Sequence, residues 1–247
     1  MGDADTLAFM RERAALVPAM IVGTDDMNRG AVGEDHNSAA FIRAGEKEPQ
    51  FYDKRQLVPF GEYLPFRPLL GGMFGKLVPG DFVPGKTAGV FSLANPPLKL
   101  GALICFEDTR ADITREQVKM GAQLLVNLTN DGWFGQTAEL DQHLVDSVFR
   151  SIENRRPMVR CTNNGITASV DAFGRVDRWL EPFTQGAATR RIVIPRVQPE
   201  TFYTRHGAVC SVSCAGVVAL TAGLVARSRR ATRRRVCGIP PLRSIRA

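Results

Sequence analysis

The chain has 247 residues, of which 44% are hydrophobic and 23% charged, and its formal net charge is +7. This composition is typical of a globular protein and excludes collagen, coiled coils and disordered chains. The charge does not indicate a nucleic-acid partner, because residues 227–247 hold eight arginines and no acid, which leaves −1 for residues 1–226.

The first third of the chain predicts a short helix followed by strands. The helix is expected over residues 3–16, and the strands over 19–23, 38–43 and 50–52. Residues 61–85 contain ten glycines and prolines, which exclude a long helix or a central strand. Because this segment is also rich in Leu, Phe and Val, we expect an apolar lid loop or a surface-inserting arm.

The next part of the chain alternates strands with helices. We expect strands over residues 88–93, 98–105, 122–128, 157–161, 166–170 and 187–194, with helices over 109–120 and 139–153. The turn Asn163-Asn164-Gly165 predicts a hairpin between two of these strands. Strands that alternate with helices in this way are typical of an α/β fold with packed layers.

Residues 207–226 form a run of 20 residues without charge, followed directly by the arginines. As a helix this run spans about 30 Å, the thickness of a bilayer core. Arginines beside a membrane helix mark its cytoplasmic side. We therefore predict a transmembrane helix over 207–226 and a cytoplasmic tail over 227–247. The alternatives are a buried helix of a soluble domain and a nucleic-acid-binding arm.

The N-terminus shows no signal peptide, since Met1 is followed by Gly-Asp-Ala-Asp. A body outside the cytoplasm has to be exported, so the absence of a leader conflicts with the predicted topology. We expect that the chain lacks its beginning.

The sequence does not indicate a metal site or a serine-hydrolase site. His36, His143 and His206 are scattered, and no HExxH, CxxC or GxSxG motif is present. Residues 80–87 match the P-loop pattern GxxxxGK[ST], but a strand rather than a helix is expected after them, which argues against phosphate binding. We expect no metal and no cofactor.

Cys105 is the candidate nucleophile. It closes an apolar strand and precedes Phe106, Glu107 and Asp108, so its thiol is expected beside polar groups at a strand end. A buried structural cysteine is the alternative. Cys161 has a similar setting, and Cys210 and Cys214 are expected to be packing residues.

Five motifs in order resemble the apolipoprotein N-acyltransferases, the membrane branch of the nitrilase (carbon–nitrogen hydrolase) superfamily. They are Tyr52-Asp-Lys54 through Glu62-Tyr-Leu-Pro, Ile104-Cys105-Phe106-Glu107, Asn130-Asp-Gly-Trp133-Phe-Gly, Arg155-Arg156-Pro157 and Thr162-Asn-Asn-Gly-Ile-Thr167. The resemblance extends from about residue 19 to the end of the chain. It implies a nitrilase-like αββα sandwich over residues 1–200, incomplete at its N-terminus, and a Glu–Lys–Cys catalytic triad.

The resemblance also implies roles for individual residues. Cys105 is the nucleophile, which takes an acyl chain from a phospholipid as a thioester. It then passes the chain to the N-terminal amino group of a lipoprotein's diacylglyceryl-cysteine. Lys54 holds the thiolate and the oxyanion by its charge, and Glu62 orients Lys54. Phe106 and Glu107 flank the nucleophile, and Trp133 forms a wall of the pocket.

One member of the triad has no match. The family's triad glutamate ends a strand upstream of the first matched motif, and no carboxylate before Lys54 is expected at a strand end. This chain is therefore expected to be a C-terminal fragment with little or no activity of its own. The expected location is the bacterial inner membrane, with a monomeric catalytic domain on the periplasmic side. A soluble nitrilase-type amidase and an inactive membrane-anchored remnant are the alternatives.

Overall fold

The computed structural model describes residues 4–26, 34–46, 48–74 and 81–237. The chain divides into two compact units, Met1–Arg205 and His206–Ala247. Each unit is described by itself below.

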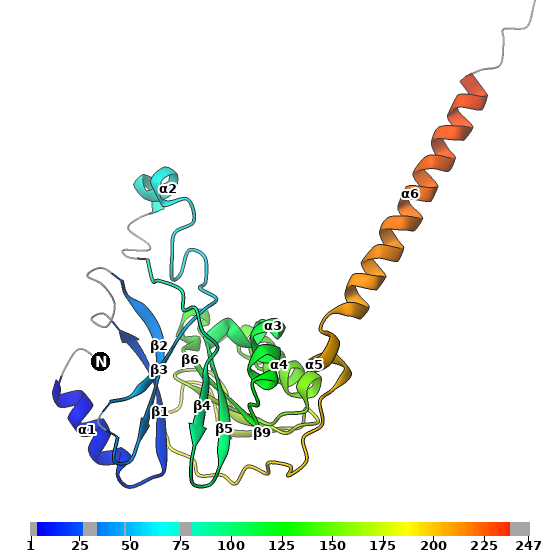
Figure 1. Cartoon of the computed structure of the whole chain (residues 1–247). Helices are drawn as coiled ribbons and strands as arrows, with labels where there is room; N and C mark the ends of the chain where they lie inside the picture. Colours follow the sequence, from blue (N-terminus) through cyan, green and yellow to red (C-terminus); the bar gives the residue numbers. More distant parts are fainter. Residues whose placement is uncertain (1–3, 27–33, 47, 75–80, 238–247) are drawn as a thin grey trace, which may run out of the picture. The chain divides into compact units, whose positions relative to one another are not determined.

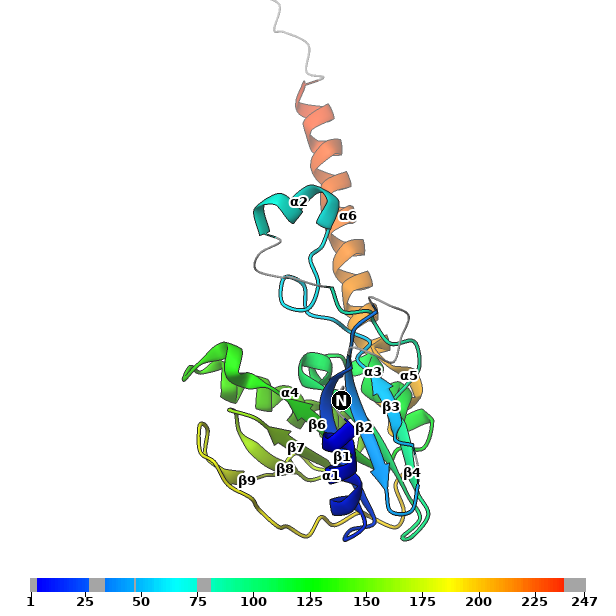
Figure 2. The same cartoon turned by 90° about the vertical axis from the view of Figure 1, so that its left-hand side faces the viewer.

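The smaller sheet of the first unit has three antiparallel strands, in the order β1 (Ala19–Asp26), β2 (His36–Arg43) and β3 (Gln50–Asp53). The register pairs Ala19 with Arg43 and Ala39 with Tyr52. The central strand β2 is almost entirely buried, as expected for a strand that is covered on both faces. Helix α1 (Ala4–Ala14) packs beside this sheet (Figure 2).

The larger sheet has six strands in chain order. They are β4 (Val90–Leu93), β5 (Leu98–Ile104), β6 (Leu124–Thr129), β7 (Met158–Thr162), β8 (Thr167–Val170) and β9 (Val176–Leu180). The pairs β5–β6 and β6–β7 are parallel, and the others are antiparallel. Parallel neighbours need a crossover, and helices α3 (Ala111–Lys119) and α4 (Glu139–Asn154) lie in these two connections.

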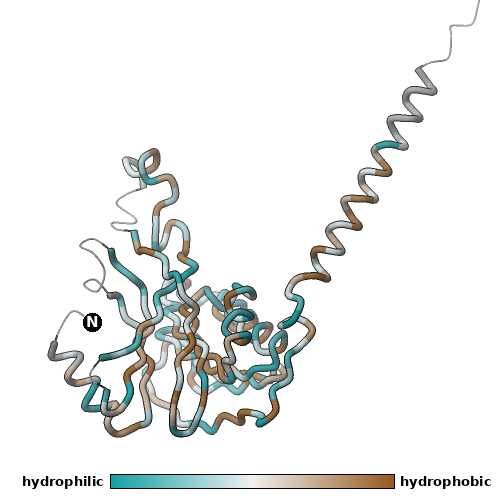
Figure 3. Tube along the Cα trace, viewed as in Figure 1, coloured by the Kyte–Doolittle hydropathy of each residue, from teal (hydrophilic) through white to brown (hydrophobic). Residues whose placement is uncertain are grey.

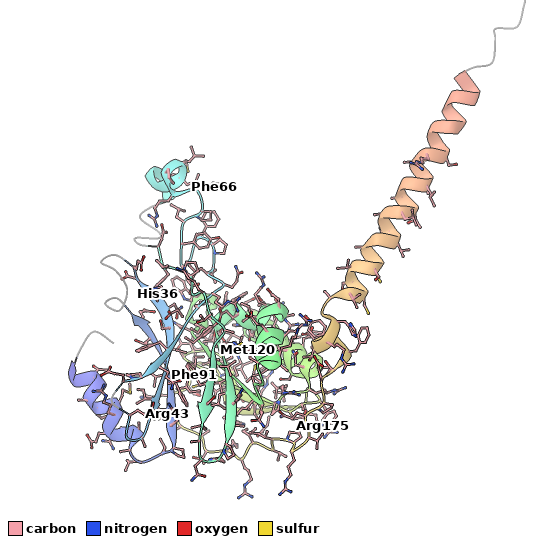
Figure 4. All side chains as sticks on the ribbon, in the orientation of Figure 1. His36, Arg43, Phe66, Phe91, Met120 and Arg175 are labelled. Carbon is pink, nitrogen blue, oxygen red and sulfur yellow. The ribbon has the colours of Figure 1, made fainter. Side chains whose placement is uncertain are left out.

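Two hydrophobic cores hold the layers together. The core between the sheets includes Phe41 of β2 and Phe91 of β4, whose rings stack with centroids 4.7 Å apart (Figure 4). The other core lies between the larger sheet and the helices, with Leu103, Leu125 and Leu144 fully or almost fully buried. The first unit is therefore a helix–sheet–sheet–helix sandwich, which confirms the predicted nitrilase-like α/β fold (Figure 1).

The carboxyl ends of β5, β6 and β7 lie side by side because these strands are parallel neighbours. Short 3-10 turns follow two of them, η1 (Cys105–Thr109) after β5 and η2 (Asp131–Phe134) after β6. Polar side chains from separate parts of the sequence therefore gather at this edge, the usual place for a site in such folds.

Two expectations about local structure need correction. The strand predicted over residues 187–194 is wrong, since this segment is irregular and β9 forms the edge of the sheet instead. Two adjacent charged residues interrupt the short apolar pattern of β9 (Val-Asp-Arg-Trp-Leu), so the sequence did not predict it. Its pairing depends on the turn that begins at Asp171, whose amide donates to the Arg175 carbonyl. The segment 61–85, predicted as a loop, contains the eight-residue helix α2 (Arg67–Phe74). Pro68 occupies its first turn, where a missing N–H costs nothing. Residues 75–80, including Gly80 of the P-loop match, lie outside the described residues. The rest of that match, residues 81–87, is followed by strand β4, as expected.

The second unit is dominated by helix α6 (Val209–Cys237), after the short α5 (Phe202–His206) at the boundary between the units. Val209–Ser228 is long and apolar enough to cross a membrane, and its residues are exposed. Figure 3 shows mostly apolar and neutral colours along this stretch. The transmembrane helix stays a prediction, because one apolar helix is weak evidence for a span.

Candidate active site

Lys54 follows directly after β3, and its side chain is fully buried. Its backbone is held on both sides, since the Lys54 amide donates to the Asn37 carbonyl and the Gly85 amide donates to the Lys54 carbonyl, both at 2.8 Å. A Cβ on Gly85 would lie 2.1 Å from the Asp53 carbonyl oxygen, so only glycine fits there. The position of Lys54 is thus fixed by the fold rather than by its own long side chain.

The Lys54 ammonium donates to Glu62 Oε1 at 2.8 Å. The same oxygen accepts from Asn37 Nδ2 at 2.8 Å, and Glu62 Oε2 accepts from the Val58 amide at 2.8 Å. Three donors therefore stabilise the charged carboxylate. Among the described residues Glu62 is the one acceptor of the ammonium, which leaves two of its three N–H groups without a partner. A buried ammonium with spare donors is unusual.

Cys105 has a φ of 52°, in the left-handed region that residues other than glycine rarely adopt. It lies immediately after β5, is half-buried, and its carbonyl accepts from Asn127 Nδ2 at 3.3 Å. The chain therefore turns sharply at the end of the strand. Non-glycine residues held in this way concentrate at functional sites, since neighbouring contacts have to offset the strain.

Glu107 connects the segment of Lys54 to the turn of Cys105. Its fully buried carboxylate accepts from the Ile104 amide at 2.9 Å, the Arg55 amide at 2.7 Å and the Tyr52 hydroxyl at 2.9 Å. Burial raises the pKa of Glu107, and these donors lower it by less. Because Tyr52 and Arg55 flank Lys54, one carboxylate holds the lysine segment against the residues around Cys105.

Phe106 and Trp133 take different positions. The Phe106 ring stacks on the His143 imidazole, with centroids 4.6 Å apart, and lies 5.6 Å from the Phe134 ring. Trp133 in η2 is 78% exposed. Phe106 is therefore half-buried and packed against His143 and Phe134, while the role of Trp133 as a pocket wall stays a prediction.

Sequence reasoning missed a cluster of fully buried charged side chains behind Cys105. Asp108, Asp131, His143 and Arg160 are hydrogen-bonded to one another. The sequence offered one indication of this cluster, namely the position of its acidic residues just after two strands. Asp108 follows β5 and Asp131 follows β6, and the carboxyl ends of neighbouring parallel strands meet at one edge.

No group of three or more His, Cys, Asp or Glu side chains suited to a metal ion occurs in the described part of the chain.

The carbon–nitrogen hydrolase family model matches residues 2–202. The chain belongs to the carbon–nitrogen hydrolase family. Relatives carry a more specific name. The chain is 41% identical over 180 residues to an apolipoprotein N-acyltransferase of Geobacter metallireducens, covering 72% of this chain and 33% of that protein. It is 34% identical over 239 residues to an apolipoprotein N-acyltransferase of Bradyrhizobium diazoefficiens, covering 94% of this chain and 43% of that protein.

Solved structures of carbon–nitrogen hydrolases share the fold. The carbon–nitrogen hydrolase of Helicobacter pylori G27 matches with a TM-score of 0.55 at 17% identity, over 73% of this chain and 64% of that one. An amidase of Nesterenkonia matches with a TM-score of 0.53 at 18% identity, over 74% of this chain and 63% of that one. The chain spans 33% and 43% of the length of these two N-acyltransferases.

Proposed function

We propose that this chain is the catalytic portion of an apolipoprotein N-acyltransferase, with Cys105 as nucleophile and Lys54 as the residue that stabilises charge. The observation that carries the proposal is the buried Lys54 ammonium with spare donors, in a segment that Glu107 ties to the residues around Cys105, a cysteine at positive φ. The five sequence motifs and the names of the relatives support the same activity.

The first half-reaction forms a thioester. The Cys105 thiolate attacks the ester carbonyl of a phospholipid, and the free N–H groups of Lys54 stabilise the resulting oxyanion. The ester C–O bond then breaks, and the lysophospholipid alkoxide leaves with the proton that the Cys105 thiol gave up on becoming a thiolate. Glu62 accepts from the ammonium and so fixes its direction. Glu107 is a positioning residue, since it bonds the backbone on both sides of the site.

The second half-reaction transfers the acyl chain. The amino group of a diacylglyceryl-cysteine attacks the thioester carbonyl, the amide bond forms, and the thiolate leaves. The Cys105 thiolate takes up the proton that the amine loses, so the thiol is restored. Dividing the transfer in two separates a difficult reaction into two easier ones.

A membrane setting suits this substrate. We propose that Val209–Ser228 spans the inner membrane with the arginine-rich end on the cytoplasmic side, which places the first unit in the periplasm. Three large apolar side chains near α2 are exposed, Phe66, Leu69 and Met73 (Figure 4 labels Phe66). We propose that this arm, with α2 standing off from the sheets in Figure 1, contacts the bilayer from which the acyl chain comes.

The test follows the acyl group to the amine. The chain in detergent is incubated with a phospholipid that carries a labelled acyl chain, and then with a synthetic diacylglyceryl-cysteine peptide. The described residues offer the ammonium one carboxylate, and the resemblance requires a second as base, so we expect slow turnover. The criterion is therefore dependence on Cys105 rather than rate.

We expect N-acylated peptide from the chain and none from Cys105→Ala. Equal product from both proteins would refute the proposal. Label released only as free fatty acid, together with hydrolysis of small amides, would favour an amidase instead.

A further inference from the structure

Four charged side chains in the Cys105 turn and in the elements around it are fully buried, and the proposed reaction uses none of them. Each comes from a different element: Asp108 from η1, Asp131 from η2, His143 from α4 and Arg160 from β7. Burying charges is costly unless they are paired, so their arrangement calls for an explanation.

The imidazole of His143 bridges the two carboxylates. Its Nε2 lies 2.8 Å from Asp108 Oδ1, and its Nδ1 lies 2.8 Å from Asp131 Oδ1. Arg160 makes a parallel bridge, donating to Asp108 Oδ2 at 2.6 Å and to Asp131 Oδ2 at 3.0 Å. Each carboxylate therefore contacts one histidine nitrogen and one guanidinium nitrogen.

The cluster is neutral when His143 is a cation. Burial by itself lowers the pKa of His143, but the hydrogen bonds with Asp108 and Asp131 outweigh it and raise the pKa to about 9. The positive charge of Arg160 repels the imidazolium and so lowers the pKa of His143. Two further charged groups on α4 act on the cluster: Asp146 interacts electrostatically with Asp108 and His143, and Arg150 donates to the Asp108 carbonyl at 3.1 Å. With two cations and two anions, no buried charge is left over.

The contacts of His143 reach the turn of the proposed nucleophile and the turn after the neighbouring strand. Asp108 is three residues after Cys105 in the same 3-10 turn, and Phe106, the next residue after Cys105, stacks on the imidazole. Asp131 lies in the turn after the neighbouring strand β6. One imidazolium thus joins the Cys105 turn to the adjacent turn through its edge and holds Phe106 against its face.

We propose that His143 is a positioning residue for Cys105, which holds the nucleophile turn in register with the turn after β6. The inference rests on the proposed role of Cys105. A residue that acts only on overall stability would change the unfolding free energy without a specific effect on this thiol, and the test separates the two roles.

The experiment measures the rate at which iodoacetamide alkylates Cys105 in the full chain in detergent, resolved by peptide mass spectrometry. The variants are His143→Gln and the charge-balanced His143→Gln/Asp131→Asn, which keeps one buried cation and one buried anion. The second variant guards against unfolding caused by an unpaired buried charge. The matched control is Asn154→Ala. Asn154 is fully buried on the same helix and accepts from the Thr204 hydroxyl at 3.0 Å.

We expect iodoacetamide to alkylate Cys105 about tenfold more slowly in both His143 variants than in the native chain at neutral pH, because a displaced thiol loses the contacts that position it for reaction. Asn154→Ala should stay within about twofold, at a temperature where all variants are folded. A charge-balanced variant that matches Asn154→Ala, or one that reacts faster than the native chain, would overturn the inference.

The native chain distinguishes this inference from the proposed function. If native Cys105 reacts no faster than N-acetylcysteine, the nucleophile role itself fails. If native Cys105 reacts faster and the His143 variants react equally fast, only the positioning role fails.

Discussion

Two regions of the described structure that bury ionic groups differ in how fully those groups are paired. At Lys54 and Glu62 the carboxylate has three donors, while the ammonium has one acceptor among the described residues. In the cluster around His143, each of the two cations bridges both anions at full burial, so the charges are fully paired, although Arg160 Nε has no hydrogen-bond partner among the described residues. Incomplete pairing leaves an electrostatic group free to act on a substrate, whereas complete pairing fixes structure.

The largest expected effect is on the rate of Cys105 acylation, and it follows from a change at Lys54, whose ammonium is incompletely paired. Lys54→Met should slow acylation of Cys105 by an activated ester about 100-fold or more, because the oxyanion loses its cation. The burst of p-nitrophenolate from a p-nitrophenyl ester of a fatty acid measures it. Lys99→Met is the matched control, since the Lys99 ammonium donates to the Met120 carbonyl at the surface and should not affect the burst. A full burst in Lys54→Met would remove the distinction between the regions.

The next effect is on stability, at the fully paired region. Arg160→Leu leaves Asp108 and Asp131 with His143 as their single cation, and should lower the unfolding free energy by about 3–5 kcal/mol. Urea unfolding followed by circular dichroism measures it. Lys54→Met should cost less, because Glu62 keeps the donors from Asn37 and Val58. If Lys54→Met lowered the unfolding free energy by more than Arg160→Leu, the Lys54–Glu62 region rather than the His143 cluster would be the one that stabilises the fold.

The pH dependence of stability sharpens the same comparison. The pKa of His143 is raised from 6.5 to about 9, so its stabilising contribution is complete below pH 6.5 and disappears as the pH rises through about 9. The loss should approach about 3 kcal/mol. We expect the difference in unfolding free energy between the native chain and His143→Gln to shrink over this range. A constant difference would mean that the imidazole is neutral throughout.

The smallest effect is expected at a surface ion pair. Arg178 donates to Asp141 at 2.5 Å, but both side chains are about half-exposed. Arg178→Ala should change the unfolding free energy by less than about 1 kcal/mol, because solvent screens the pair. The midpoint of urea unfolding measures this change in free energy and gives a reference for the size of the Arg160→Leu effect. A loss as large as that of Arg160→Leu would show that burial does not control the energetics here.

Periodic patterns of strands and helices in the sequence predicted an α/β fold, and the resemblance to the N-acyltransferases implied the sandwich. The patterns failed at β9, whose stability depends on pairing with β8 rather than on its own apolar residues. Motifs pointed to Cys105, Lys54, Glu62 and Glu107 as candidates, but they could not show that the hydrogen-bond donors of Glu107 come from two separate segments, residues 52–56 and Ile104. His143 and Arg160 were missed because a buried charge is recognisable only once its partners in the fold are known.

The location of the acyl group after incubation with phospholipid vesicles tests the central claim most directly. Peptide mass spectrometry of the native chain should find one acyl chain on the peptide that contains Cys105, removable by neutral hydroxylamine as expected for a thioester. The Lys54→Met variant should show little of it. An acyl chain on another residue, or equal acylation of Cys105 in Lys54→Met, would contradict the account.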